Sequence, residues 1–161
     1  MQQVYLPGDN ERGRWMRLDA ARILKRYFFC ERSLVLSQSG WLAGIDSFDV
    51  KTLLPAFSWQ DAMIANALRE RVFELRFPSR MMEIGDDEPL IAVFDAALHA
   101  PSAAAFVLSL ARIFKPALLA AYREYEQLSD PLADGPLLRD LRIAIAEKSE
   151  QIAALTGMAQ A

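Results

Sequence analysis

The sequence predicts an all-α protein, folded as an antiparallel four-helix bundle. Four long segments repeat apolar residues at the spacing of an amphipathic helix, and clusters of turn-forming residues separate them. The connection between the second and third long segments runs roughly from Pro78 to Ala103, which is long enough to cross the bundle and to carry a short helix. A strand pattern is absent apart from the first few residues. We therefore expect one helical-bundle domain over residues 17–157, preceded by an extended N-terminal arm over residues 1–16.

The first long helix is expected from about Leu18 to Ala43. Residues 7–10 of the arm form a turn cluster, Pro-Gly-Asp-Asn, and Gly44 supplies a C-terminal stop. Along the helix, Glu31 and Gln38 fall on the same row as large apolar residues. A carboxylate and an amide are therefore predicted to face the core.

The second long helix is expected over Ser58–Phe77. Ser58 is a suitable N-cap with Asp61 three residues later, and Pro78 ends the helix. Pro55 predicts a break or a kink near it, and a shorter helical piece from Val50 to Phe57 is expected before this helix. One row of the helix mixes polar and large apolar residues: Trp59, Met63, Asn66, Glu70, Phe73 and Phe77. Its polar members, Asn66 and Glu70, are expected to be buried or half-buried.

A short helix from about Pro89 to His99 and two further long helices complete the chain. Ser102 is expected to cap a long apolar helix over Ala103–Leu128, which Pro116 should bend or split. The last helix is expected over Leu137–Leu155. The predicted inner row of the third long helix ends in a carboxylate: Leu110, Phe114, Ala117, Ala121 and Glu124. On the last helix Lys148 shares the apolar row, and Glu147 and Glu150 lie on the adjoining arc.

Each long helix thus offers an acid near mid-length, and with this helix order the chain resembles the ferritin-like superfamily. The candidates are Glu31, then Asp61 or Glu70, then Glu124, then Glu147 or Glu150. The resemblance implies a carboxylate-bridged di-iron or di-manganese centre, with Glu31, Glu70, Glu124 and Glu147 as its ligands. The chain departs from the family in lacking both Glu-x-x-His motifs, because His99 is its one histidine. An all-carboxylate site for Mn²⁺, Mg²⁺ or Ca²⁺ stays open as an alternative, and no cofactor is the primary expectation.

Composition narrows the function class. The chain has 161 residues, with 18 basic against 21 acidic ones and a net charge of −3, which makes nucleic-acid binding unlikely as its main role. Cys30 is the single cysteine, beside two phenylalanines, so we expect a buried structural thiol and a reducing compartment. No signal peptide is evident, and Arg112 and Lys115 interrupt the most apolar stretch, so we expect no membrane span and a cytoplasmic location.

Catalytic signatures are missing from the sequence. It has no Gly-rich phosphate loop, no nucleophile elbow, no metalloprotease histidine pair and no Cys–His constellation. The leading hypothesis is therefore a non-catalytic protein that acts through protein–protein association or self-assembly. Two alternatives are a carboxylate-bridged metalloprotein or oxidoreductase, and a binder of small apolar ligands that uses the aromatic residues of the first half. The predicted partner surface lies on the basic first helix and the arm: Arg14, Trp15, Arg22, Lys25 and Arg26.

Overall fold

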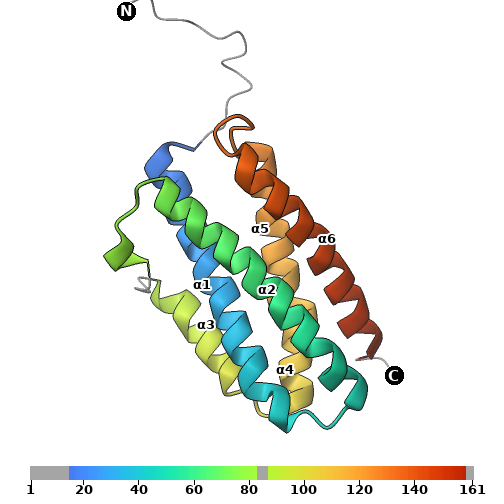
Figure 1. The fold of residues 1–161 in the computed structure, drawn as a ribbon. Coiled ribbons are helices and arrows are strands. Elements are labelled where there is room, and N and C mark those ends of the chain that lie inside the picture. The colour runs from blue at the N-terminus through green and yellow to red at the C-terminus, as the bar shows by residue number, and fades with distance from the viewer. Residues whose placement is uncertain (1–14, 83–86, 159–161) are drawn as a thin grey trace, which may run out of the picture.

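The computed structural model describes residues 15–82 and 87–158, and within these ranges the protein is all-α with no strand (Figure 1). Most of the predicted arm, residues 1–14, lies outside the described residues. The elements in chain order are α1 (Arg17–Trp41), a 3₁₀ turn (Leu42–Gly44), α2 (Phe48–Glu74), a 3₁₀ turn (Ser79–Met81), α3 (Glu88–Leu98), α4 (Ala103–Ser109), a π-helical turn (Leu110–Phe114), α5 (Lys115–Leu128) and α6 (Gly135–Met158).

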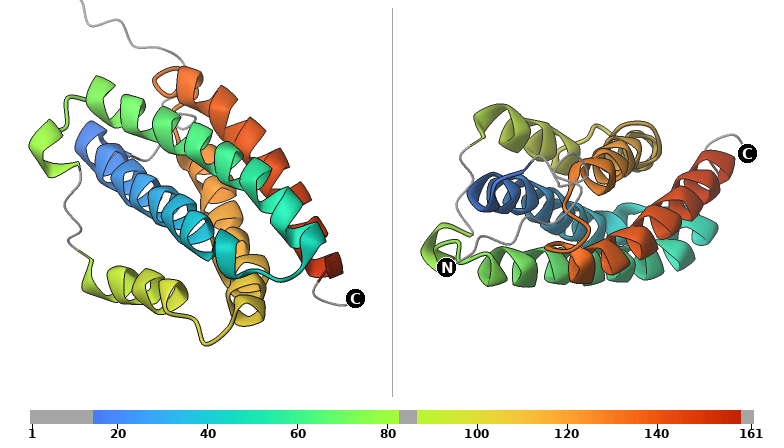
Figure 2. Two further views of the ribbon diagram at one scale, coloured as in Figure 1. Left: turned by 60° about the horizontal axis from the view of Figure 1, so that its bottom comes forward. Right: turned by 90° about the horizontal axis from the view of Figure 1, so that it is seen from above.

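The helices pack lengthwise around a shared core. α1 and α2 form a hairpin with the most extensive contact in the fold, and α6 packs against both α2 and α5. α4, the π-helical turn and α5 make one continuous rod, and the short helix predicted in the long connection is α3, which lies against α1 (Figures 1 and 2). α1 therefore lies between α2 on one side and α3 on the other.

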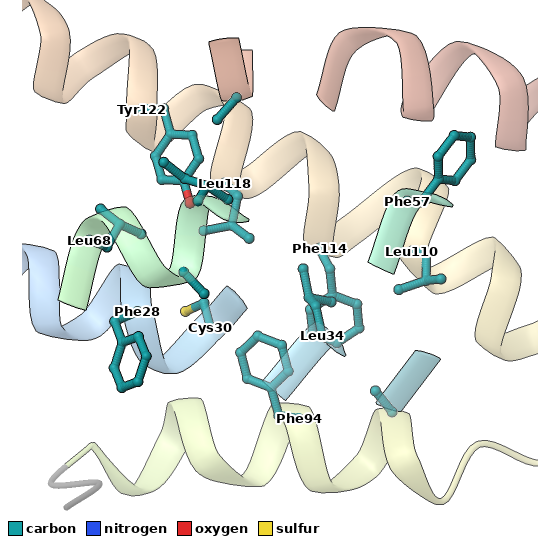
Figure 3. Packing of buried hydrophobic residues seen from close by; sticks show 14 of the residues in the cluster. Phe28, Cys30, Leu34, Phe57, Leu68, Phe94, Leu110, Phe114, Leu118 and Tyr122 are labelled. Carbon is teal, nitrogen blue, oxygen red and sulfur yellow. The ribbon is translucent and has the colours of Figure 1, made fainter. Parts of the chain in front are cut away.

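Aromatic contacts hold α3 in place. The ring of Phe94 lies beside that of Phe114 (Figure 3), with 4.8 Å between the ring centroids. The centroid of the Phe29 ring lies 5.8 Å from that of Phe94. At the other end of α3, the indole N–H of Trp41 donates to the carbonyl of Leu98 at 3.1 Å, and the Trp41 ring stacks on Phe106. The long connection is thus anchored to α1 and to the rod.

α2 differs from its prediction, because it is a single helix that begins ten residues earlier than expected. Ser47, and not Ser58, is the N-cap, and its side chain accepts from the backbone N–H of Val50. The predicted break is wrong: Pro55 lies inside the helix, on its exposed face. Water can hydrate the carbonyl one turn earlier that loses its helical donor, so the helix continues past the proline.

The predicted cap at the start of the rod is confirmed. Ser102 caps α4 and accepts from the N–H of Ala105 at 3.1 Å. At Pro116, where a bend or a split is predicted, the rod is continuous: the π-helical turn ends immediately before Lys115, and α5 continues with Pro116 in its first turn. A π-helical turn closes its hydrogen bonds over one more residue than an α-helical turn, so it rotates the residues that follow about the helix axis.

The same rod is long and apolar enough to cross a membrane by length and composition. Over Ala103–Leu128 the mean hydropathy reaches 1.6, with 39% of the window buried inside the fold. Core helices of folded domains meet the same criterion, so this composition does not by itself assign a membrane span. In the structure, the lysine near the middle of the rod lies among charged partners in the core.

Candidate functional site

A buried network of charges lies where the long helices meet. α1 contributes Glu31, α2 contributes Asp61, the first residue of α5 is Lys115, and α6 contributes Lys148. All four side chains are at most 1% exposed. Two carboxylates and two ammonium groups balance one another, so the network is neutral overall. Burial of such charges is tolerated only when each is paired and hydrogen-bonded.

Asp61 and Lys148 hold the network together, because each has two charged partners. The ammonium of Lys148 lies 2.8 Å from Glu31 Oε1 and 2.9 Å from Asp61 Oδ1. The other Asp61 oxygen, Oδ2, accepts from Lys115 Nζ at 2.7 Å. The four charges therefore form the chain Glu31–Lys148–Asp61–Lys115, alternating in sign.

Neutral side chains complete the hydrogen bonding. Gln38 Nε2 donates to Asp61 Oδ2 at 2.8 Å, and the hydroxyl of Tyr122 donates to Glu31 Oε1. At the far end Gln151 accepts from Lys115 at 2.7 Å and donates to Gln60 at 2.8 Å. Within the described part of the chain, the network leaves one buried side-chain atom without a partner, Gln38 Oε1. The site is close to full hydrogen-bond saturation, which favours a fixed geometry.

The electrostatic balance differs between the two carboxylates. Burial acts to raise the pKa of Asp61, but the two neighbouring ammonium groups outweigh it and hold that pKa well below its usual range. For Glu31 burial prevails over the attraction of Lys148, and the pKa is raised. Burial likewise lowers the pKa of Lys115, whereas the two carboxylates beside Lys148 overcome burial and raise its pKa. Asp61 and Lys148 are thus the firmly ionised pair.

The four carboxylates predicted as metal ligands are not brought together. Glu31 is in the core, whereas Glu70 is exposed beside Arg69 and Glu124 is exposed on α5. Glu147 is partly exposed between α2 and α6. In the described residues no group of three or more His, Cys, Asp or Glu side chains is placed to hold a metal ion.

The burial predicted for Glu70 is wrong, because a different face of α2 packs into the core. The buried face of this helix passes through Asp61, so the row that contains Trp59, Asn66 and Glu70 faces outward. The inward position predicted for Glu124 is also wrong, since Tyr122 and Tyr125 are the buried residues beside it on α5. In both helices the true inner face is rotated from the predicted one.

The predicted basic partner surface is not a continuous open patch. Arg14 lies outside the described residues, and Trp15 is half-buried. Lys25 is buried, with its ammonium 5.8 Å from the centre of the Phe77 ring. Arg22 and Arg26 are exposed but have acidic neighbours, Asp19 at 3.8 Å and Asp87 at 2.6 Å respectively.

One member of the network, Lys115, is not among the site residues that the sequence predicts, because it enters there only as an interruption of an apolar run. Asp61 is one of the two candidate inward acids predicted for its helix, and the structure buries Asp61 and leaves the other, Glu70, exposed. A usable signal was present for Lys115, because a lone lysine inside a long apolar helix and directly before a proline has few ways to reach water. Glu31 and Lys148, in contrast, were predicted to share the inner rows.

A groove between α2 and α6 combines exposed apolar residues with acidic ones. Trp59, Met63 and Ile143 line it and are 63%, 52% and 46% exposed. The groove has a volume of about 520 Å³. Its acidic lining residues come from both helices: Glu70, Glu74, Asp140 and Glu147. We call this feature the α2–α6 groove.

A second groove, between α1, α3 and α5, is more apolar. It has a volume of about 440 Å³, and aromatic residues from several elements line it, among them Trp15, Tyr27, Phe94 and Phe114. The Tyr27 hydroxyl donates to the carbonyl of Ala121 at 3.1 Å. Cys30 also lines this groove, and burial raises the pKa of its thiol to about 12, which agrees with the predicted structural thiol. We call this feature the α1–α3–α5 groove.

Comparisons of the chain with models of known protein families, with curated proteins and with solved structures find no match.

Proposed function

We propose that this chain is a non-catalytic helical-bundle protein that acts by associating with another protein, through the α2–α6 groove. The observation that carries the proposal is the gathering of three exposed large apolar side chains, Trp59, Met63 and Ile143, in one groove. Clustered exposed apolar residues with a polar rim are typical of protein interfaces, and tryptophan and methionine are enriched there.

We further propose that the fold is a ferritin-like four-helix bundle. Supporting this, α1, α2, the α4–α5 rod and α6 each contribute one charge to the buried network, and α3 lies in the connection between the second and third of these elements. In this arrangement the network occupies the mid-bundle position where ferritin-like proteins place metal-binding carboxylates.

The alternative of a di-iron or di-manganese centre has little support from the side chains present. Glu31 and Asp61 are the carboxylates of the network, and both already contact the ammonium of Lys148. A divalent cation placed between them would lie beside that ammonium and close to Lys115, and like charges at such distances repel strongly in a dry site. The donor set therefore does not fit a carboxylate-bridged metal pair, and we favour a role for the network in stability.

Site-directed photo-crosslinking in the source cell tests the association. A photo-crosslinking amino acid in place of Met63 is expected to give covalent adducts with a polypeptide. The same amino acid in place of Phe48 is the matched control, because Phe48 is on the same helix, is 76% exposed and lies outside the groove. Absence of adducts at position 63, or equal adducts at both positions, would contradict the proposal.

A second candidate function is the binding of a small apolar ligand in the α1–α3–α5 groove. Its volume of about 440 Å³ and its aromatic lining fall within the range of ligand pockets, and this groove holds residues of the aromatic first half. Tyr27 already has its hydrogen-bond acceptor, so contacts with a ligand would be mainly apolar.

Thermal unfolding in the presence of 1-dodecanol tests this second function. Ligand binding to the native state is expected to raise Tm, and Ala117→Phe, which adds a ring to the groove lining, should abolish the rise. Ala120→Phe on the exposed side of the same helix, outside the groove, is the control. An unchanged Tm for the native protein, or an equal rise in both variants, would reject ligand binding at this groove.

A further inference from the structure

We infer that the partner held by the α2–α6 groove is a basic amphipathic helix of another protein. This inference rests on the proposed function, and it adds the chemistry of the partner. Three properties of the groove carry it: its shape, its apolar centre and the sign of its rim.

The groove has the shape and length to take a helix. It lies between two helices packed side by side, and its lining residues on α2 extend from Trp59 to Glu74. At 1.5 Å per residue this stretch covers roughly 22 Å, or about four helical turns. A helix laid in such a groove presents apolar residues at positions i, i+3, i+4 and i+7 along one face.

The apolar centre supplies the contact that such a face needs. Trp59 and Met63 are four residues apart and so lie one turn apart on the same side of α2, and Ile143 faces them from α6. Each is more than two-fifths exposed, so a partner would bury substantial apolar area here. Large residues of this kind at the centre of an interface contribute most of its binding energy.

The charge of the groove rim determines the charge that we expect of the partner. Four carboxylates and two guanidinium groups line the groove, which makes it acidic. One of the two cations, Arg71, is engaged by Asp134 at 2.8 Å and by Glu74 at 3.0 Å, and the other, Arg139, is 3.7 Å from Asp140. Glu70 lies 3.5 Å from Arg69, which is outside the groove lining. With Arg69 and Asp134 included, five carboxylates stand against three guanidinium groups, so the rim keeps an acidic excess.

Charge also argues against other occupants. A two-fold dimer through this groove would set its acidic rim against the same rim of a second copy, which costs energy. Nucleic acids and anionic membrane surfaces carry the same sign as the groove and would be repelled. A protein helix with lysine or arginine beside its apolar face satisfies both the centre and the rim.

Titration of the full-length protein with two synthetic helical peptides tests the inference. The peptides share one apolar face, and their polar face carries lysine and arginine in one and glutamate in the other. We expect the basic peptide to bind at least about tenfold more tightly, with an affinity that falls as salt is added. Tryptophan fluorescence, to which Trp59 in the groove contributes, and calorimetry report the binding.

Variants of the protein test whether the groove residues cause the preference for the basic peptide. Met63→Ala should weaken the binding of both peptides. The double variant Glu70→Gln, Glu147→Gln should reduce the difference in affinity between the basic and the acidic peptide. Glu124→Gln, an exposed carboxylate outside the groove, is the control. Equal binding of the two peptides, no binding of the basic one, or a preference that survives neutralisation of Glu70 and Glu147 would overturn the inference. If crosslinking at position 63 still yields adducts in any of these cases, association through the groove stands and only the basic helix is rejected.

Discussion

The ammonium of Lys148 lies 2.8 Å from Glu31 Oε1, although 117 residues separate the two in the chain. Both side chains are at most 1% exposed. This contact joins α6 to α1 across the core, and Lys148 extends it to α2 through Asp61 at 2.9 Å. One side chain thus connects three helices, and the stability of the fold should depend on it more than on any surface ion pair.

Replacing Lys148 by methionine should lower the free energy of unfolding by about 3–5 kcal/mol. The apolar length of the side chain is kept, but two buried carboxylates lose their shared cation. Urea denaturation monitored by circular dichroism measures the loss. Lys51→Met is the matched control, since Lys51 is half-buried on α2 and its ammonium donates to the backbone carbonyl of Ala43 at 3.5 Å, a long hydrogen bond to a neutral acceptor. That control should change stability by no more than about 0.5 kcal/mol. Similar small effects for both variants would show that the network contributes little.

Glu31 and Lys148 should also show strong energetic coupling. Glu31→Gln and Lys148→Met are each expected to destabilise the protein, and the double variant should lose about 1–3 kcal/mol less than the two losses added together. The reason is that Lys148→Met leaves the Glu31 carboxylate without its cation, and Glu31→Gln removes that buried charge. The same double-mutant cycle on Glu126 and Arg142, an exposed pair at 2.6 Å, should give a coupling below about 1 kcal/mol. Additive losses at the buried pair would contradict this account.

The positions of the helices follow from local signals, and so they could be predicted. Helix ends are predicted at Gly44 and Pro78 from their backbone properties, and a helix start is predicted at Ser102 from its capping side chain. Each predicted boundary agrees with the structure to within a few residues. Periodicity placed Glu31 and Gln38 on the inner face of α1, where both are buried. These predictions needed no knowledge of any other helix.

The site could be predicted only in part, because its members are defined by their partners. Periodicity shows that Lys148 faces inward, but it carries no information about which carboxylate lies opposite. The sequence offers Asp61 and Glu70 as alternative inward acids on opposite sides of α2, and only packing against the other helices shows that the side with Asp61, Leu68 and Val72 is buried. The π-helical turn before Lys115 likewise has no signal in an apolar periodicity.

Acid should remove the contribution of Asp61 to stability. Its pKa is held below the ordinary value of 3.8 in the folded protein, so its contribution is fully present above that value. As the pH falls below about 4, the unfolded state takes up the proton first, and the contribution declines toward the folded pKa. The stability difference between the native protein and Asp61→Asn should therefore be constant above about pH 5 and shrink below about pH 4.

Urea denaturation across this pH range measures the difference. Glu31 opposes the effect in a separate window, because its raised pKa gives a gain in stability on acidification at pH values above its ordinary 4.5. Comparing the two proteins at each pH cancels most of that gain. Asp46→Asn, at an exposed aspartate, controls for the change of side chain. A difference that stays constant down to pH 2 would contradict the assignment of Asp61 as the ionised anchor.

The start of α2 can be tested with two serines of the same helix. Ser47→Ala should cost about 1 kcal/mol, because it removes the acceptor for the backbone N–H of Val50 at the first turn. Ser58→Ala, eleven residues later in the helix interior, should be neutral or slightly stabilising, since alanine has the higher helix propensity. Thermal and urea unfolding measure both changes. The opposite order would mean that the helix begins at Ser58 after a break at Pro55.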